Sequence, residues 1–298
     1  MTDPIMMAQM VSGAGFIAAL DQSGGSTPGA LKAYGVPESE FAGDDAKMFD
    51  LVHQMRVRII TAPSFSGRKV LGAILFEKTM DGQADGQPVP AALWARGVVP
   101  FLKVDKGLED EANGVQLMKP IPGLDDLLAR AVTLGVFGTK MRSVIKAADR
   151  AGIAAIVKQQ FALGEQILAH GLVPILEPEV SIKAPDREEI ENILRDEIAK
   201  GLDALTGDKQ VMLKLSIPAK ADTYATLVGH HRVARVVALS GGFSCDEACD
   251  HLSHNHGMIA SFSRALLEDL RHGQSDAEFD AALSKAIDQI YAASVIKA

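Results

Sequence analysis

The stretch that decides the fold is LVPILEPEV at residues 172–180, followed by REEIENILRDEIAKGLDAL at residues 187–205 and VMLKLSI at residues 211–217. The first and third segments are almost continuously apolar, which is typical of strands buried on both faces of a parallel sheet. The middle segment has helical spacing, and Asp186 stands where an N-cap residue is expected. This order of strand, helix and strand predicts a parallel βαβ unit.

The same alternation runs through the rest of the chain. Six further apolar runs resemble these strands: GFIAAL at 15–20, VLGAILF at 70–76, VPFLKV at 99–104, VFGTKM at 136–141, VARVVALSG at 233–241 and MIASFSR at 258–264. Segments with helical spacing begin at Leu124 and Ala148, and long helices are expected at about residues 42–60 and 276–296. The turn-rich segment after Met80 predicts an excursion between two elements.

Eight strands that alternate with helices favour a single α/β domain over residues 1–298, a (β/α)8 TIM barrel. No linker rich in Pro or Ser divides the chain into two domains. The alternative is an open doubly wound sheet, but no G-x-G-x-x-G motif follows the first strand.

Composition excludes several classes of partner. A formal net charge of -8 argues against nucleic acid as a partner, because nucleic-acid binders usually gather a basic face. The N-terminal residues carry no basic export signal, and no apolar stretch is long enough to span a membrane. The only cysteines, Cys245 and Cys249, lie four residues apart in a predicted helix, which suits buried thiols in a reducing cytoplasm.

The residues that carry chemistry should lie where the barrel strands end, because the active site of this fold is built at the carboxyl ends of its strands. The polar residues found there are Asp21, Lys103, Asp105, Lys140, Arg142, Glu177, Glu179, Lys214, Ser240, Gly241, Gly242, Ser261 and Arg264.

Lys214 is the sharpest candidate, since apolar residues flank it within a strand. Burial would lower the pKa of its amine and make the amine nucleophilic, and Lys103 and Lys140 would help by suppressing one another's charge. The alternative is a lysine held in a structural ion pair.

Carboxylates and glycine-rich loops complete the predicted site. Glu177 and Glu179 lie two apart and so share a face, and Asp21 adds a third carboxylate; these groups serve as acid, base or counter-ion. Residues 240–242 (SGG) could cradle a phosphate with Arg264, although a tight turn would also explain them. A second such stretch at residues 23–26 suggests a substrate with a phosphate at each end.

The histidines at positions 251, 254 and 256 precede the eighth strand and are therefore expected at the amino-terminal end of the barrel. No carboxylate or cysteine spacing completes a metal site with them, so no metal is predicted.

Five stretches together resemble the class I fructose-bisphosphate aldolases. They are ALDQSGGS at 19–26, LKVDKG at 102–107, PILEPE at 174–179, LSGG at 239–242 and SFSRAL at 261–266, in order from the first strand to the eighth. The resemblance implies reversible, cofactor-independent cleavage of fructose 1,6-bisphosphate in glycolysis and gluconeogenesis. It also implies a cytoplasmic homo-oligomer, either a dimer or a tetramer.

The resemblance also implies a role for each residue. Lys214 would form the imine, Glu177 would act in carbinolamine dehydration, Asp21 would take the C4 hydroxyl proton, Lys140 would supply charge beside the imine, and Glu179 would pair with the lysines. Arg142 would hold the far side of the sugar phosphate, Ser240, Gly241, Ser261 and Arg264 the ketone-side phosphate, and Ser23, Ser26 and Lys103 the other phosphate.

The sequence departs from the animal members at several positions. Gln22 replaces an acid, Ala30 an arginine and Met141 a tryptophan, and the chain ends at Ala298 without their terminal tyrosine, as expected of a shorter microbial branch. Another group must then protonate the enamine. Two other functions stay open: a different Schiff-base barrel enzyme, such as a transaldolase or an aldolase for other sugars, and a non-catalytic barrel scaffold.

Overall fold

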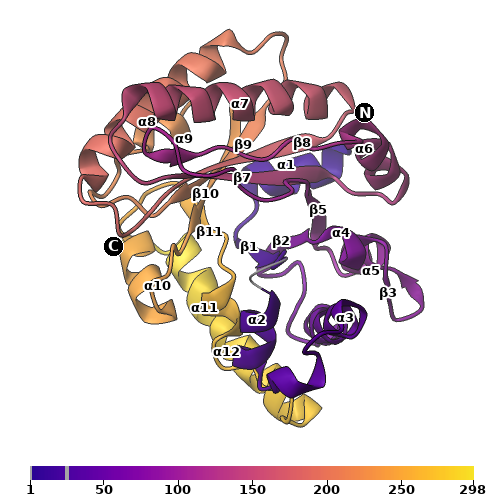
Figure 1. The fold of residues 1–298 in the computed structure, drawn as a ribbon. Coiled ribbons are helices and arrows are strands. Elements are labelled where there is room, and N and C mark those ends of the chain that lie inside the picture. Colours follow the sequence, from indigo (N-terminus) through magenta and orange to yellow (C-terminus); the bar gives the residue numbers. More distant parts are fainter. Residues whose placement is uncertain (1, 24–26) are drawn as a thin grey trace.

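The computed structural model describes residues 2–23 and 27–298. Its main sheet is a nearly closed barrel of parallel strands in the order β1(Phe16–Leu20), β2(Val70–Leu75), β5(Val99–Lys103), β7(Gly138–Ile145), β8(Val173–Val180), β9(Val211–Ser216), β10(Val233–Leu239) and β11(Met258–Ala260). The two end strands approach each other, and the Ala19 amide donates to the Phe262 carbonyl at 3.0 Å. The predicted (β/α)8 barrel is therefore confirmed (Figure 1).

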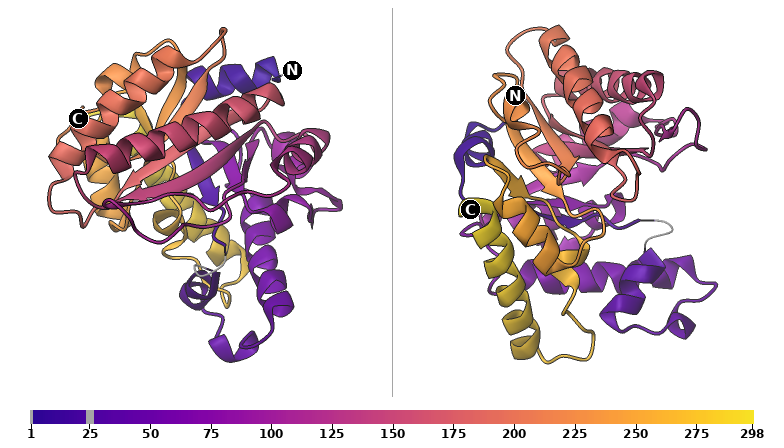
Figure 2. Two further views of the ribbon diagram at one scale, coloured as in Figure 1. Left: turned by 45° about the horizontal axis from the view of Figure 1, so that its top comes forward. Right: turned by 90° about the vertical axis from the view of Figure 1, so that its left-hand side faces the viewer.

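Helices surround this sheet. They are α1(Pro4–Ser12), α2(Thr27–Tyr34), α3(Asp45–Thr61), α4(Glu77–Met80), α5(Val89–Ala95), α6(Leu124–Thr133), α7(Arg150–Ala169), α8(Arg187–Ala204), α9(Ala225–Val228), α10(Cys245–Ser253), α11(Arg264–Leu267) and α12(Asp276–Val295), with a 3-10 turn at Glu38–Glu40. Figures 1 and 2 show α7 and α8 on the opposite side of the barrel from α12.

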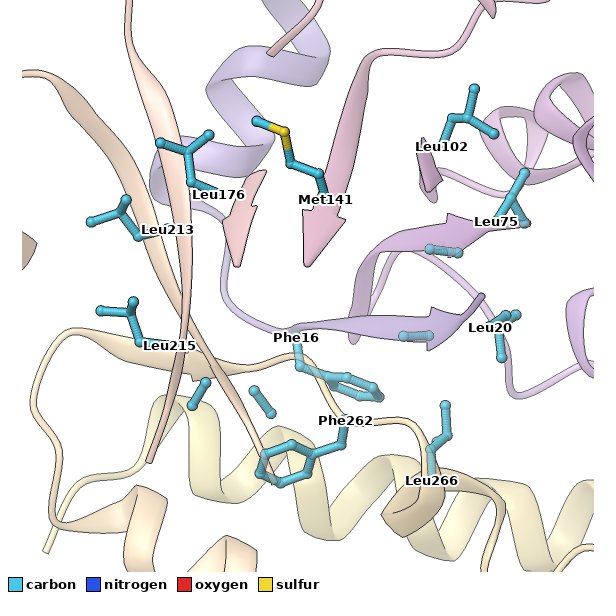
Figure 3. Close-up of a cluster of buried hydrophobic side chains, with 14 of the residues drawn as sticks. Phe16, Leu20, Leu75, Leu102, Met141, Leu176, Leu213, Leu215, Phe262 and Leu266 are labelled. Carbon is cyan, nitrogen blue, oxygen red and sulfur yellow. The ribbon is translucent and has the colours of Figure 1, made fainter. Parts of the chain in front are cut away.

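Each barrel strand lies between two apolar layers, one inside the barrel and one between the strands and the helices. The charged residues of the predicted site that belong to the strands lie on their inner face. Along β9, Leu213 and Leu215 join the layer between strands and helices, whereas Met212 joins the cluster inside the barrel. Because side chains alternate between the faces of a strand, Lys214 must share the inner face with Met212. Figure 3 shows part of the outer layer, with Phe16 of β1 and Phe262 close to α12.

Helix α1 closes the amino-terminal end of the barrel. Met6 and Met10 belong to the inner cluster, and the Gln9 side-chain amide donates to the carbonyls of Leu71 at 2.8 Å and Gly97 at 2.7 Å. Arg235 of β10 donates to the Met10 carbonyl at 2.8 Å. This helix fills one end of the barrel, so a cavity can form only toward the carboxyl ends of the strands.

Two strand ends differ from the sequence-based expectation. Strand β7 continues to Ile145 instead of ending at Met141, because β8 pairs with it over its whole length and the short strand β6(Val115–Gln116) pairs with its last residues. Strand β11 ends at Ala260, so Ser261 and Arg264 follow the strand instead of lying on it, and Arg264 begins α11.

Two local predictions have mixed outcomes. The excursion after Met80 is a hairpin of β3(Gln83–Ala84) and β4(Gln87–Pro88), whose turn residues Asp85 and Gly86 have φ values of 51° and 73°. Asp186 is the N-cap residue of α8 as predicted, but its side chain makes no capping hydrogen bond in the described structure. No helix among the described residues is long and apolar enough to cross a membrane.

Candidate active site

A cavity of about 1130 Å³ lies at the carboxyl ends of the strands. The structure brings nearly all predicted site residues to it: Asp21, Ser23, Lys103, Lys140, Arg142, Glu177, Glu179, Lys214, Ser240, Gly241, Gly242, Ser261 and Arg264. The remaining one, Ser26, lies outside the described residues. A cavity of this size is typical of a small-molecule site.

Four charges of alternating sign form the floor of the cavity. The Lys214 Nζ atom lies 3.1 Å from Glu177 Oε1, and Lys140 Nζ lies 2.8 Å from Glu177 Oε2 and 2.6 Å from Asp21 Oδ2. The four side chains are at most 10% exposed. Buried charges are stable only when paired, and here each amine or carboxylate has a partner of opposite sign.

The pKa values follow from this pairing. Burial raises the pKa of Asp21, but the ammonium groups of Lys140 and Lys214 outweigh burial and hold it well below its ordinary value. The same lysines lower the pKa of Glu177 against the effect of burial. Burial lowers the pKa of Lys140, yet Asp21 and Glu177 together raise it above its ordinary value. The expected mutual suppression of lysine charges is therefore wrong for Lys140, because carboxylates stand between the amines.

A second group of charges lies above the floor. Lys103 Nζ is 2.6 Å from Asp105 Oδ1, the Arg142 amide donates to Asp105 Oδ2 at 3.2 Å, and Arg142 Nε is 2.5 Å from Glu179 Oε2. The expectation that Glu179 pairs with lysines is corrected, since its ion pair among the described residues is with Arg142. The register explains this partner: Arg142 and Glu179 are each two residues beyond Lys140 and Glu177, which moves the pair one layer outward.

Glycine is required in the loop after β10. Gly241 has a φ of 63°, and a Cβ atom there would lie 2.5 Å from Ile182 Cγ2. Gly242 has a φ of 125°, and its position for a Cβ atom is 3.3 Å from the guanidinium of Arg264. Nearby, the buried hydroxyl of Ser261 has no hydrogen-bond partner among the described residues. The glycine loop after β10 leaves its backbone open to a ligand. The segment after β11 places the Arg264 guanidinium and the Ser261 hydroxyl beside it.

The cysteines and histidines lie apart from the four charges of the floor. Cys245 and Cys249 are free and buried in α10, as predicted. His256 lies before β11, and its Nδ1 atom is 2.9 Å from Asp222 Oδ2. His251 packs against the Phe243 ring at 5.0 Å. Among the described residues, no three His, Cys, Asp or Glu side chains are grouped so as to hold a metal.

Sequence reasoning missed a residue behind Glu177. The pairing of β8 with β9 ends at Leu176 and Leu213, one residue before Glu177 and Lys214, so the strands part at the site. The side chain of Gln160 in α7 accepts from the Glu177 amide at 3.1 Å and donates to Ser143 Oγ at 2.7 Å. A glutamine on the buried face of a predicted helix was the available signal.

Fold and site together define a barrel enzyme that holds lysines and carboxylates in contact, the groups that imine chemistry uses. The family model for class-I fructose-bisphosphate aldolase, a glycolytic enzyme, matches residues 6–216, which is more than half of the chain. The chain belongs to the class-I fructose-bisphosphate aldolase family, and it is an aldolase of the carbon–carbon lyase class that acts on a sugar phosphate.

Solved structures share the fold. A Plasmodium falciparum fructose-bisphosphate aldolase, crystallised with TRAP and a small-molecule inhibitor, matches with a TM-score of 0.78 and 20% identity over 99% of this chain and 94% of that chain. A Corynebacterium glutamicum protein matches with a TM-score of 0.56 and 15% identity over 98% and 92% of the two chains. At these identities the likeness concerns the fold alone.

The Gln160→Leu variant is expected to lower kcat about tenfold and to leave KM nearly unchanged, because the Glu177 amide loses its acceptor and the strand shifts. Steady-state kinetics on fructose 1,6-bisphosphate would measure both constants. The matched control is Gln159→Leu. Gln159 is the neighbour of Gln160 in the chain, and its side chain makes two hydrogen bonds to the Met118 backbone that this variant removes. Equal kinetics in the two variants would contradict a positioning role for Gln160.

Proposed function

We propose that this aldolase cleaves fructose 1,6-bisphosphate reversibly to dihydroxyacetone phosphate and glyceraldehyde 3-phosphate through an imine on Lys214. The observation that carries the proposal is the contact of the buried Lys214 amine with Glu177 at 3.1 Å, at the floor of a cavity that also contains phosphate-binding groups. A lysine with a carboxylate in reach has a proton acceptor when it attacks a carbonyl.

The substrate would lie with its ketone end toward the loop after β10. Ser240, Gly241, Gly242, Ser261 and Arg264 would bind the phosphate on C1, while Ser23, Lys103 and Arg142 would face the distal phosphate. The Ser261 hydroxyl, for which the described part of the chain offers no hydrogen-bond partner, and the arginine beside Gly242 support the first assignment. Lys103 Nζ donates to the Asp105 carbonyl at 2.9 Å and to Asp105 Oδ1 at 2.6 Å, and a phosphate dianion would offer it a third acceptor.

Imine formation follows from the ionised state of Glu177. Its lowered pKa keeps the carboxylate ionised, and its position 3.1 Å from Lys214 Nζ makes it the acceptor for the proton that the Lys214 ammonium must lose before attack. The neutral amine then adds to the C2 carbonyl. Glu177 returns its proton to the carbinolamine hydroxyl, which leaves as water, and Lys140 keeps the carboxylate in place at 2.8 Å. The product is a positively charged imine on Lys214.

Cleavage of the C3–C4 bond would use Asp21, which, like Glu177, is paired with Lys140. Asp21 is ionised and would take the proton of the C4 hydroxyl, so that the C3–C4 bond breaks and its electrons move into the imine. The aldehyde leaves, the enamine takes up a proton from water at C3, and Asp21 gives up its proton to water. Hydrolysis of the imine releases dihydroxyacetone phosphate and regenerates Lys214.

Borohydride trapping tests this function. Incubation with dihydroxyacetone phosphate, reduction and peptide mass mapping, all in EDTA, should place one adduct on Lys214. Absence of an adduct, together with loss of activity in EDTA, would overturn the assignment. The substrate class is tested by turnover, since equal rates on fructose 1,6-bisphosphate and fructose 1-phosphate would favour an aldolase for other sugars.

We also infer a cytoplasmic homo-oligomer, either a dimer or a tetramer. The free, buried thiols of Cys245 and Cys249 and the glycolytic family support the location. Family membership supports assembly, and light scattering of the purified chain would give the subunit number.

A further inference from the structure

Arg56 of α3 is a buried charge that the mechanism does not use. Its side chain is 1% exposed, and its guanidinium donates to Thr79 Oγ1 at 2.8 Å, to the Gln22 carbonyl, and to Gln22 Oε1 at 3.4 Å. These acceptors are neutral oxygens. Burial lowers the pKa of Arg56 to about 10, although Asp21 acts in the opposite direction. Since burying a cation has a large desolvation cost, packing of α3 alone does not explain an arginine here.

Gln22 connects Arg56 to Ser263, which lies in the segment after β11. Its backbone and side-chain oxygens accept from Arg56, and its amide nitrogen donates to Ser263 Oγ at 2.6 Å and toward the Ala19 carbonyl at 3.4 Å. Both Gln22 and Ser263 line the cavity, whereas Arg56 lies behind it. One glutamine therefore joins the end of β1 to the segment after β11.

This link lies at the seam of the barrel. Strands β1 and β11 are the two ends of the sheet order, and β11 has only three residues. Gln22 directly follows Asp21 on one side of the seam, and Ser263 directly precedes Arg264 on the other. The hydrogen bond between Gln22 and Ser263 therefore links Asp21, which the proposed mechanism uses for proton transfer, to Arg264, which it uses for phosphate binding.

We propose that Arg56 and Gln22 form a seam clamp, in which two positioning residues fix Asp21 relative to Arg264. Arg56 holds Gln22 from behind, and Gln22 holds Ser263. The clamp sets how the C4 hydroxyl meets Asp21 when the C1 phosphate is bound at Arg264, so the inference rests on the proposed function. Without the bridge, the backbone bond from the Ala19 amide to the Phe262 carbonyl would still join the seam. Asp21 and Arg264 would lose the side-chain link that fixes them, and small displacements of reacting groups cost large factors in rate.

The Gln22→Leu variant tests the clamp. We expect kcat for fructose 1,6-bisphosphate to fall about tenfold and KM to rise about tenfold, because both sides of the seam lose their alignment. Competitive inhibition by inorganic phosphate should weaken by a similar factor. Gln22→Glu should recover both constants to within about threefold of wild type, since a carboxylate accepts from Arg56 and from the Ser263 hydroxyl.

Two further variants make the result specific. Gln9→Leu is the matched control, because it removes two hydrogen bonds from a glutamine at the opposite end of the barrel, and its kcat and KM should stay at wild-type values. Ser263→Ala breaks the bridge while leaving Arg56 and Gln22 joined. It should mainly raise KM, and it replaces Gln22→Leu as the decisive variant if that protein does not fold.

The outcomes separate the clamp from the proposed function. If wild type gives no borohydride adduct on Lys214, the proposed function fails and the clamp fails with it. If wild type gives the adduct but Gln22→Leu and Ser263→Ala behave like Gln9→Leu, only the clamp is overturned. Failure of Gln22→Glu to recover activity would also overturn it, because the proposal requires a side chain at this position that hydrogen-bonds to both Arg56 and Ser263.

Discussion

The Lys214→Ala variant is expected to lose cleavage of fructose 1,6-bisphosphate by a factor of about 10⁴ or more, because the proposed mechanism stores the electrons of the breaking bond in an enamine formed on this lysine. Folding should survive the change. Glu177 keeps its ion pair with Lys140 at 2.8 Å when Lys214 is removed. Steady-state kinetics, borohydride trapping and the unfolding transition of the same preparation would measure activity, imine and stability together.

Lys146→Ala is the control for Lys214→Ala. Lys146 is a half-exposed lysine that pairs with Glu111 at 2.8 Å, and its removal should change neither trapping nor rate. A Lys214→Ala enzyme that still gave a reduced adduct at Lys103 or Lys140 would show that the imine forms on a different amine.

The Lys140→Met variant is expected to lose activity by about 10³ and stability by about 3–5 kcal/mol, since it leaves two buried carboxylates without their shared cation. Asp21 loses its 2.6 Å partner, so the effect of burial would be opposed by Lys214 and Lys103 alone and the pKa of Asp21 would be raised from its wild-type value. Kinetics at pH 7 and urea unfolding over a range of pH would measure the two losses.

The loss of stability in Lys140→Met should depend on pH. In wild type the lowered pKa values of Asp21 and Glu177 contribute stability above the ordinary carboxyl pKa, and that contribution is lost as pH falls through the folded-state values. In Lys140→Met the raised pKa of Asp21 has the opposite effect, because protonation relieves a buried charge. The stability deficit should therefore shrink between about pH 8 and pH 5, and a constant deficit would count against unpaired burial as its cause.

The sequence predicted the barrel and the positions that face its cavity because both follow from periodicity. An apolar strand buried on both faces must alternate inner and outer residues, and this alternation alone places Lys214 and Glu177 inside. The position of Glu179 was also predictable, but its partner was not. That partner depends on how far Arg142 stands along a neighbouring strand, which is a matter of register.

The residues that support the site could not be predicted from the sequence, for a different reason. Arg56, Gln160 and Ser263 act through one to three hydrogen bonds each, to groups that are distant in the chain. A buried glutamine or arginine in a predicted helix has no periodic signature of its own. The same holds for α1, whose place at the end of the barrel follows from contacts with Leu71 and Gly97.

The alternating charges at the floor of the cavity have a consequence for how this enzyme can diverge. Two ammonium groups and two carboxylates sum to zero, so the floor itself neither attracts nor repels a sugar phosphate. In the proposed assignment, attraction for the anionic ends of the ligand comes from the groups above the floor, Arg264 with the glycine loop at one end and Lys103 with Arg142 at the other. Bond breaking and ligand choice would then depend on separate residues, and substitutions above the floor could select a new sugar while the cleavage chemistry stays the same.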